Sequence, residues 1–303
     1  MIKTTRIAEN GPALSRIVAG VMKWGAWGKQ LDTQQMRQLM EQCVELGVTT
    51  FDHADIYGNY STELEFGVAL RLNPALREKL QLVTKCGIRM ITPNRPDHRI
   101  KSYDTSKGHI IRSVEQSLRN LHTTYLDLLL IHRPDPLLHP DEVAEAFTAL
   151  KKDGKVLHFG VSNFTPSQFE MLNSWIPLVT NQLEASILHM EPFHDGTFDQ
   201  CLQHRIKPMV WSPLGGGAIF AKVKEKRIQE IWNIAENIAS RKENVKIDQI
   251  LIAWLLRHPA EILRVLGTAN IDRIKAAVAA LDIGLTREEW FELWQASAGT
   301  EVP

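Results

Sequence analysis

The stretch LDLLLIH at residues 126–132 contains four consecutive apolar residues, Leu128 to Ile131, and ends on His132. A strand with one face in water alternates apolar and polar side chains, whereas a strand covered on both faces can stay apolar along its length. Such a run is typical of a parallel sheet that is covered by helices. The stretch therefore predicts a central strand of an α/β fold.

Seven other short runs rich in Val, Ile or Leu predict strands, with amphipathic segments of helical spacing between them. The expected strands, including the first, cover 16–21, 48–54, 80–86, 126–132, 156–162, 179–184, 209–212 and 263–267. The expected helices cover 33–46, 62–70, 106–121, 140–152, 165–172, 197–204, 228–257, which is long enough for two helices, 272–281 and 286–296. Eight strands that alternate with helices form a (β/α)₈ barrel, so we predict an α/β fold of the TIM-barrel type.

An open, doubly wound sheet would produce the same local pattern, but its nucleotide-binding members carry a G-x-G-x-x-G turn after the first strand. Residues 19–24 read AGVMKW and lack that turn. Before the first strand, Asn10–Gly11 lies between segments 4–7 and 13–17 and predicts an N-terminal β-hairpin, placed to close the bottom of the barrel. No Pro- or Ser-rich linker divides the chain, so we expect a single domain over 1–303. Long loops at 89–106 and 215–225 follow the third and seventh strands, where substrate pockets are built.

The composition excludes several classes of partner. The chain has 303 residues, 35 basic and 35 acidic side chains, and an isoelectric point near 7.2, so nucleic acid is not an expected partner. The three cysteines, Cys43, Cys86 and Cys201, are odd in number and far apart, as is usual in a reducing compartment. Residues 1–10 lack the apolar stretch of a signal peptide, and the longest apolar run, 250–256, is too short to span a bilayer. We therefore expect a cytoplasmic protein with no membrane partner.

Polar side chains interrupt or end the apolar runs of three consecutive predicted strands. Asp52 and Tyr57 lie at and just beyond the end of the second strand, Lys85 near the end of the third, and His132 at the end of the fourth. The carboxyl ends of all strands in such a barrel meet at one mouth. A buried ammonium needs a carboxylate partner, and Asp52 is one strand away from Lys85. Taken singly, the residues also fit structural roles, but their occurrence together at neighbouring strand ends favours one reactive site.

The chemistry follows from the residue types. An ammonium beside Tyr57 stabilises its phenolate, so we expect Lys85 to lower the tyrosine pKa from its ordinary value of about 10 and make it a proton donor. His132 is placed to donate a hydrogen bond to a substrate oxygen. His53 alternates with Asp52 along the strand, so it is expected to face the helices. Asp55 is expected to shape the following turn.

At this point the sequence resembles the aldo-keto reductase superfamily, in particular its bacterial NADPH-dependent oxidoreductases. The resemblance rests on FDHADIYG at 51–58, Thr84–Lys85, DLLLIH at 127–132 and GVSNF at 160–164. It continues, in the same order, through Asn181–Gln182, WSPLGG at 211–216 and LGTANIDRI at 266–274. The resemblance implies a barrel that reduces a small-molecule aldehyde or ketone with NADPH and without metal. It also implies that Tyr57 is the general acid, that Lys85 and Asp52 tune it, and that His132 orients the carbonyl.

The resemblance assigns cofactor contacts as well, and each group of residues has one task. It places Gly20, Val21 and Met22 beside the nicotinamide ribose, and Ser162, Asn163 and Gln182 on the carboxamide. It places Trp211 against the nicotinamide ring, and Ser212, Leu214 and Gly215 along the pyrophosphate. Around the 2′-phosphate it places Gly267, Thr268 and Arg273.

The chain departs from the family pattern at two positions near the cofactor. Gly267 stands where many members have a lysine, and Ala276–Ala277 replaces an acid–amide pair beside the adenine. Because Arg273 is kept, NADPH is still expected over NADH. The substrate pocket is expected to be walled by Trp24, Trp27 and parts of 88–107 and 134–138.

Two other functions remain open at this stage. A metal-dependent hydrolase would use Asp52, His53, Asp55 and His132 as ligands, but adjacent strand residues point to opposite faces. A non-catalytic, nicotinamide-nucleotide-binding regulatory or redox-sensing subunit would use the same barrel, and the complete set of four catalytic residues argues against it.

Overall fold

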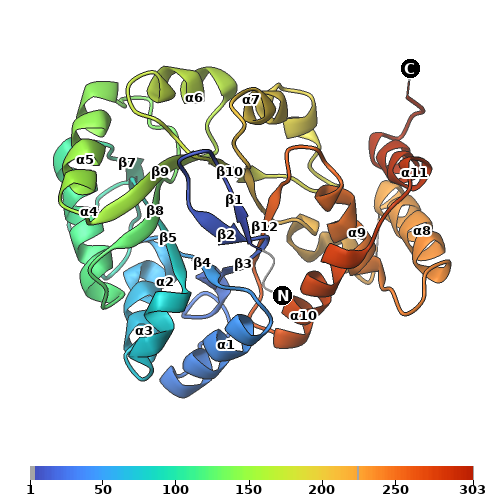
Figure 1. Cartoon of the computed structure of the whole chain (residues 1–303), viewed down its shortest axis with the longest axis horizontal. Helices are drawn as coiled ribbons and strands as arrows, with labels where there is room; N and C mark the ends of the chain where they lie inside the picture. The colour runs from blue at the N-terminus through green and yellow to red at the C-terminus, as the bar shows by residue number, and fades with distance from the viewer. Residues whose placement is uncertain (1–3, 224, 303) are drawn as a thin grey trace.

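Eight parallel strands close into a barrel in the computed structural model, which describes residues 4–223 and 225–302. The strand order around the barrel is β10-β11-β12-β3-β4-β5-β8-β9. The strands are β3 (Ile17–Gly20), β4 (Thr50–Asp52), β5 (Gln81–Cys86), β8 (Leu126–Ile131), β9 (Val156–Ser162), β10 (Asn181–Glu184), β11 (Met209–Trp211) and β12 (Leu263–Leu266). Each overlaps one predicted strand, and helices surround the barrel (Figure 1). The predicted (β/α)₈ barrel is therefore confirmed.

Several helices begin next to a side chain that caps them. Asp32 accepts a hydrogen bond from the third residue of α1 (Thr33–Glu45), and Thr165 from the third residue of α6 (Pro166–Asn173). Each bond satisfies a backbone donor that has no partner inside the helix. The long helices are α1 (Thr33–Glu45), α3 (Thr62–Leu70), α4 (Lys107–Asn120), α5 (Pro140–Lys152), α6 (Pro166–Asn173), α7 (Thr197–Gln203), α8 (Lys226–Ser240), α9 (Ile247–Leu256), α10 (Ile271–Ala279) and α11 (Arg287–Ala298). The predicted segment 228–257 is thus two helices, α8 and α9, and α11 packs against α8.

The N-terminal hairpin closes one end of the barrel. Its strands, β1 (Thr4–Arg6) and β2 (Ala13–Ser15), pair antiparallel. Ile7 and Leu14 are fully buried and pack with residues of the barrel interior, which include Val18, Val83, Leu128, Leu130, Met209 and Leu263. The hairpin lies across the centre of the ring of strands in Figure 1. The turn differs from the prediction, because the Gly11 N–H bonds to the Ala8 carbonyl and makes a wider loop than a two-residue Asn-Gly turn.

The interior residues of each strand occur at every second position, and this alternation positions the site. On β5, Val83 lies in the barrel core and Lys85 comes two residues later, nearer the carboxyl end. On β8, Leu128 and Leu130 lie in the core and His132 follows at the strand end. The core therefore continues directly into a layer of polar residues at the mouth.

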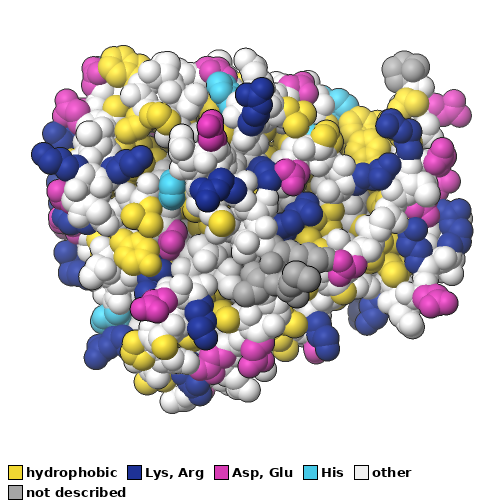
Figure 2. Space-filling view, in the orientation of Figure 1, with side chains coloured by type: hydrophobic (Ala, Val, Ile, Leu, Met, Phe, Trp, Pro, Cys, Tyr) yellow, Lys and Arg dark blue, Asp and Glu magenta, His cyan; other side chains and the backbone are white. Residues whose placement is uncertain are grey.

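The two long loops carry short elements of their own. Within the loop after β5, β6 (Ile88–Arg89) pairs with β7 (Ser102–Tyr103), and after β11 a 3₁₀ turn, η4, spans Gly215–Phe220. Position 224 of the predicted loop 215–225 lies outside the described residues. Charges of both signs are interspersed over the face in Figure 2. Among residues 4–223 and 225–302, every helix is too short or too polar to cross a bilayer.

Candidate active site

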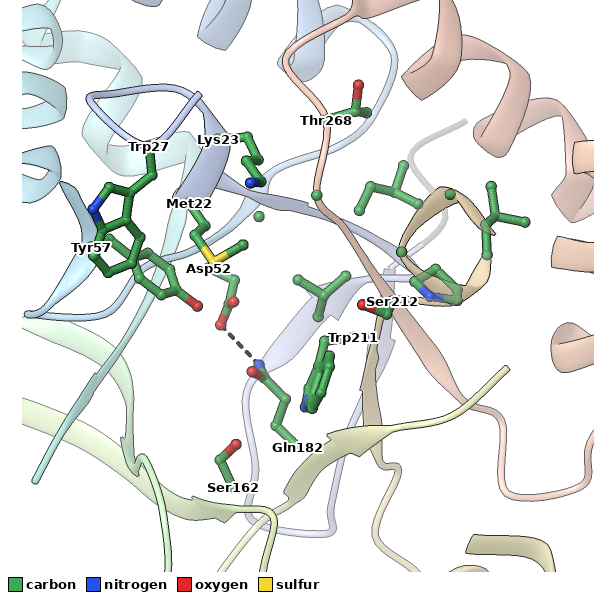
Figure 3. Close-up of a pocket in the computed structure, with 18 of the residues that line it drawn as sticks. Met22, Lys23, Trp27, Asp52, Tyr57, Ser162, Gln182, Trp211, Ser212 and Thr268 are labelled. Carbon is green, nitrogen blue, oxygen red and sulfur yellow. Dashed lines mark hydrogen bonds between the residues drawn. The ribbon is translucent and has the colours of Figure 1, made fainter. Parts of the chain in front are cut away.

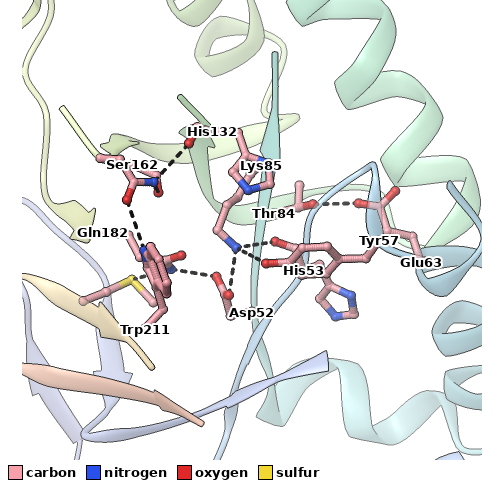
Figure 4. A network of polar contacts seen from close by, with 12 residues as sticks. Asp52, His53, Tyr57, Glu63, Thr84, Lys85, His132, Ser162, Gln182 and Trp211 are labelled. Carbon is pink, nitrogen blue, oxygen red and sulfur yellow. Dashed lines mark hydrogen bonds and ion pairs between the residues drawn. The ribbon is translucent and has the colours of Figure 1, made fainter. Parts of the chain in front are cut away.

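A buried ammonium gathers the predicted polar residues at the carboxyl ends of the strands. Lys85 Nζ donates to Asp52 Oδ2 at 2.8 Å, to the His53 carbonyl oxygen at 2.8 Å and to Tyr57 Oη at 3.2 Å (Figure 4). Lys85 is 1% exposed and Asp52 is 2% exposed. Asp52 and Tyr57, two members of the predicted cluster, therefore both bond to the ammonium.

A tight turn brings Tyr57 back over Lys85. The Tyr57 N–H bonds to the Ala54 carbonyl at 3.1 Å, and α2 (Tyr57–Tyr60) is one irregular turn. Gly58 has φ +59°, and a Cβ there would lie 2.4 Å from Thr62 Oγ1. Both its backbone angle and its surroundings therefore require glycine, and this turn sets the position of the tyrosine.

The hydroxyl of the nearby Tyr60 is hydrogen-bonded to backbone groups. Its hydroxyl accepts from the Met90 N–H at 3.0 Å and donates to the Ile88 carbonyl at 3.3 Å. Its ring also lies under the guanidinium of Arg95, at 4.4 Å from the centroid. Of the two tyrosines, only Tyr57 bonds to the buried ammonium.

Lys85 lowers the pKa of Tyr57, as predicted, but the net shift of this pKa is upward and not downward. Burial raises the pKa of Tyr57 above its ordinary value, and the opposing effect of Lys85 is smaller. The reason is that the phenolate loses its hydration in the barrel mouth. This loss destabilises the phenolate more than the neighbouring ammonium stabilises it. For Lys85 the balance is reversed: burial favours the neutral amine, but Asp52 and Tyr57 together leave its pKa raised. The site therefore holds a neutral phenol beside a protonated lysine.

The two histidines of the region face different environments. His132 lines the mouth, with its ring centroid 6.1 Å from that of Tyr57, and burial holds its pKa well below the ordinary value. It is therefore a neutral imidazole at neutral pH. His53 points away, with its ring 4.4 Å from that of Phe66 on α3, as predicted. Burial lowers the pKa of His53 to about 3, so it is neutral as well.

Asp55 and Glu63 lie behind the cluster. Asp55 is placed by its N–H, which donates to the Lys85 carbonyl at 3.0 Å, and its carboxyl bonds to the Ile56 N–H in the turn, as expected of a turn residue. Sequence reasoning missed Glu63, which is 2% exposed and accepts from Thr84 Oγ1 at 2.6 Å. Its signal was weak, since an acidic residue in the first turn of a helix is usually solvated.

A second group of polar residues adjoins the first. Gln182 Nε2 donates to Asp52 Oδ1 at 2.8 Å, so this amide is directly linked to the Asp52–Lys85 pair (Figure 3). Trp211 Nε1 donates to Asn163 Oδ1 at 3.2 Å, and Asn163 Nδ2 donates to Ser162 Oγ at 2.7 Å. The four side chains that the sequence assigned to one end of a nicotinamide therefore lie together.

The backbone at two of the predicted positions is strained. Asn163 has φ +60° and Ser212 has φ +52°, in the left-handed region that non-glycine residues seldom adopt. Asn adopts this region more readily than most residues, and several residues away from the cleft, such as His122 and Glu261, also adopt it. Asn163 and Ser212 both lie just beyond strand ends, where they turn the chain around the mouth.

One cleft of about 960 Å³ connects these groups. Figure 3 shows Tyr57, Trp211 and Thr268 around it, and His132 and Arg273 line it as well. Most predicted site residues line it, namely Gly20, Met22, Trp27, Asp52, Tyr57, His132, Ser162, Asn163, Gln182, Trp211, Ser212, Leu214, Gly267, Thr268 and Arg273. Lys85 lies beneath the lining and reaches it through Tyr57 and Asp52. Lys101, from the predicted wall segment 88–107, lines the cleft, and so do Arg133 and Lys23, which were missed.

Three predicted positions lie elsewhere. Trp24 is not a pocket wall: it is fully buried against Phe51, and its Nε1 donates to the Thr268 carbonyl at 3.1 Å. Val21 is likewise in the core. Gly215 turns toward Leu188, whose Cδ1 would be 2.7 Å from an added Cβ, and the next two glycines line the cleft instead. In each case the local backbone turn, which the sequence does not reveal, points the residue away.

Arg273 and Thr268 line the end of the cleft beside α10. Asn270 caps α10 through the N–H groups of Asp272 and Arg273, while the Arg273 side chain is exposed. Gly267 has no heavy atom within 4 Å of an added Cβ, so packing does not require glycine there. In the described part of the chain, no three or more His, Cys, Asp or Glu side chains are grouped as a metal site would need.

Comparisons with known proteins agree with this geometry. The sequence model described as "Aldo/keto reductase family" matches residues 16–298. Relatives include the uncharacterized oxidoreductase YcsN of Bacillus subtilis, 47% identical over 95% of this chain and 96% of the relative, and oxidoreductase YdhF of Escherichia coli, 46% identical over the whole of both. A 6-dehydroglucose reductase of Agrobacterium fabrum is 43% identical over 95% of this chain and 96% of its own.

A solved structure is similar over nearly the whole chain. It is that of the thermostable aldo-keto reductase Tm1743 in complex with the inhibitor epalrestat, with a TM-score of 0.79 and 26% identity. The similarity covers 97% of this chain and 99% of that one.

Proposed function

The chain belongs to the aldo/keto reductase family, and on that premise we propose that it reduces aldehydes or ketones to alcohols with NADPH, Tyr57 supplying the proton. The observation that carries this proposal is the Lys85–Tyr57 hydrogen bond of 3.2 Å beside His132, at the inner end of a cleft that reaches Arg273. We also propose a cytoplasmic location, which the three free, buried cysteines support.

The cleft has the features that a nicotinamide dinucleotide needs. Its volume of about 960 Å³ is at the upper end of the usual range for ligand sites. Gln182 and Asn163 offer amide groups beside the indole of Trp211, which suits an aromatic ring that carries a carboxamide. The glycine-containing turn after Ser212 exposes backbone, as phosphate groups prefer, and Arg273 offers a charged fork at the far end.

The residues at the inner end divide the chemistry between them. When bound, the nicotinamide supplies the hydride that reaches the carbonyl carbon. Neutral His132 donates a hydrogen bond to the carbonyl oxygen and holds it next to Tyr57. Tyr57 transfers its proton to that oxygen, and the Lys85 ammonium stabilises the phenolate left behind. Asp52 keeps Lys85 protonated and in place. The 6-dehydroglucose reductase among the relatives supports a small carbonyl compound as substrate.

The proposal is tested by mixing NADPH-loaded protein with 4-nitrobenzaldehyde in a stopped-flow instrument. We expect the nicotinamide absorbance to decay as one equivalent of alcohol forms. Tight NADPH binding without decay, for this and other reactive aldehydes, would instead indicate a nucleotide-binding regulatory subunit.

The pH dependence follows from two pKa shifts. Reduction needs protonated Tyr57, whose pKa is raised above 10.0, and neutral His132, whose pKa is lowered well below 6.5. We therefore expect kcat/KM for reduction to be flat from about pH 6.5 to about pH 10 and to fall only above that range. The same assay in the direction of alcohol oxidation should show a rise toward high pH, because that reaction needs the phenolate. A reduction rate that falls steadily from pH 7 to pH 9 contradicts the assignment.

Arg273→Ala is expected to raise the KM for NADPH by about 10- to 100-fold, because a charge-assisted hydrogen bond to phosphate is lost. The KM for NADH, which lacks the 2′-phosphate, should change by less than about threefold. Lys275→Ala is the matched control, since Lys275 is an exposed cation on the same helix that does not line the cleft. Equal weakening of both nucleotides would show that Arg273 does not read the 2′-phosphate.

A further inference from the structure

Arg133 adds a positive charge, besides that of Lys85, at the inner end of the cleft, where Tyr57 and His132 lie. It follows His132 directly, lines the cleft and is partly buried. Its guanidinium carbon lies 5.8 Å from the centroid of the Trp211 ring, a weak cation–π contact. Within residues 4–223 and 225–302 its nitrogens make neither a hydrogen bond nor an ion pair.

No carboxylate in the described lining neutralises this charge. Asp135, two residues along the chain, is engaged elsewhere: Oδ2 accepts from Thr105 Oγ1 at 2.9 Å and Oδ1 from the Leu137 N–H at 2.8 Å. The lining acids are Asp52, which is held by Lys85 and Gln182, and Asp248. Asp248 opens α9, which packs against α10 at the Arg273 end of the cleft. Arg133 therefore faces the substrate end without a protein counter-charge.

Other features of the same end agree with an anion site. Lys101, from the β6–β7 segment, lines the cleft as an exposed cation, and Tyr103 of the same segment lines it as well. Arg133 directly follows His132, whose ring centroid lies 6.1 Å from that of Tyr57. Its charge is also a minor influence on both groups: it opposes the burial that raises the pKa of Tyr57 and adds to the burial that lowers the pKa of His132. An anion bound at Arg133 would thus lie beside the carbonyl position.

We propose that the substrate is an oxo-acid, a carbonyl compound that carries a carboxylate, and that Arg133 binds this carboxylate. The inference rests on the function proposed above and narrows its substrate class. A guanidinium presents two parallel N–H donors that match a carboxylate, and a partly desolvated site strengthens the pairing. A guanidinium without a counter-charge balances the one negative charge of a carboxylate. The carboxylate is not altered in the reaction; it fixes which carbonyl compounds reach Tyr57.

The test compares substrates of equal shape and different charge. The probes are 3- and 4-formylbenzoate and the corresponding neutral formylbenzamides, assayed with NADPH. For the wild-type protein we expect kcat/KM to be at least about tenfold higher for one or both formylbenzoates than for the matching amide. Arg133→Met should raise the KM for the preferred formylbenzoate by about 10- to 100-fold and change the KM for the amide by less than about twofold.

Three further variants distinguish a specific contact between Arg133 and the carboxylate from a general attraction by nearby positive charges. Arg133→Lys keeps the charge but loses the fork, so it should recover part of the affinity for the formylbenzoate. Lys101→Met removes the exposed cation. It should raise the KM for the formylbenzoate less than Arg133→Met does, and this increase should shrink as salt is added. Arg99→Met is the control, because Arg99 is an exposed cation of the same loop that does not line the cleft. This variant should change the KM for neither the formylbenzoate nor the amide.

The outcomes distinguish this inference from the function on which it rests. If wild-type protein reduces the formylbenzoates and formylbenzamides equally well, the carbonyl reductase stands and the role of Arg133 is overturned. If Arg133→Met slows both substrate classes through kcat, Arg133 acts on the reacting groups and does not select an anion. If no aldehyde in the panel is reduced, both proposals fail.

Discussion

Tyr57→Phe is expected to lower kcat for carbonyl reduction by about 10²- to 10⁴-fold, which is the usual contribution of a positioned proton donor. The substitution removes one oxygen atom and leaves the ring between His132 and Trp27. NADPH affinity should therefore change by less than about twofold. Single-turnover decay of the nicotinamide absorbance measures the rate, and a fluorescence titration measures the affinity.

Tyr60→Phe is the matched control for this variant. Tyr60 lies three residues further on, but its hydroxyl bonds to the backbone of Ile88 and Met90 and does not contact Lys85. Its loss should leave the pH dependence of kcat unchanged. Turnover of Tyr57→Phe within about threefold of the wild-type rate would refute the role of Tyr57.

The second large effect is expected in stability. Asp52→Asn removes the negative charge beside Lys85, which is 1% exposed, and leaves a buried ammonium without its counter-charge. Breaking a buried ion pair at one partner costs about 3–5 kcal/mol, so the free energy of unfolding should fall by about that amount. Urea unfolding of the nucleotide-free protein, followed by tryptophan fluorescence, measures it, since bound nucleotide would mask the loss. Turnover should fall as well, because a neutral amide in place of the Asp52 carboxylate cannot hold the charge on Lys85.

A double variant tests the physical reason. Asp52→Leu combined with Lys85→Met replaces both charges by apolar groups of similar size, so much of the lost stability should return while the protein stays inactive. If Asp52→Asn alone unfolds at the same urea concentration as the wild-type protein, loss of the Asp52 charge does not lower the free energy of unfolding, and the expectation is wrong.

The barrel itself was predictable because its signal is periodic and repeated. The run at 128–131 and its counterparts in the other strands must be covered on both sides, and eight such runs in alternation with helices admit few arrangements. Details without a periodic signal were not predictable. The hairpin turn is wider than Asn10–Gly11 indicated, since its shape depends on the Gly11 N–H reaching the Ala8 carbonyl.

The placement of the site residues was predicted best where they lie on strands. Asp52, Lys85 and His132 follow the alternation of the barrel interior, so their convergence was expected: Lys85 bonds to Asp52, and the His132 ring lies 6.1 Å from that of Tyr57. Trp24 and Gly215 lie on turns, where one backbone angle decides whether a side chain meets the cleft or the core. The chemical roles of these residues remain predictions for the experiments above.

The sequence by itself determined the barrel, its order of strands and the set of polar residues at its mouth, because alternation along each strand carries that information. Only the tertiary structure decided the electrostatics of the mouth. The pKa of Tyr57 is raised although a lysine lies 3.2 Å from its hydroxyl, since burial outweighs the neighbouring charge. Likewise, no carboxylate in the described lining pairs with Arg133, and the nearby Asp135 bonds to Thr105. Both results depend on how much water and which charges surround a group, and those are properties of the packed structure.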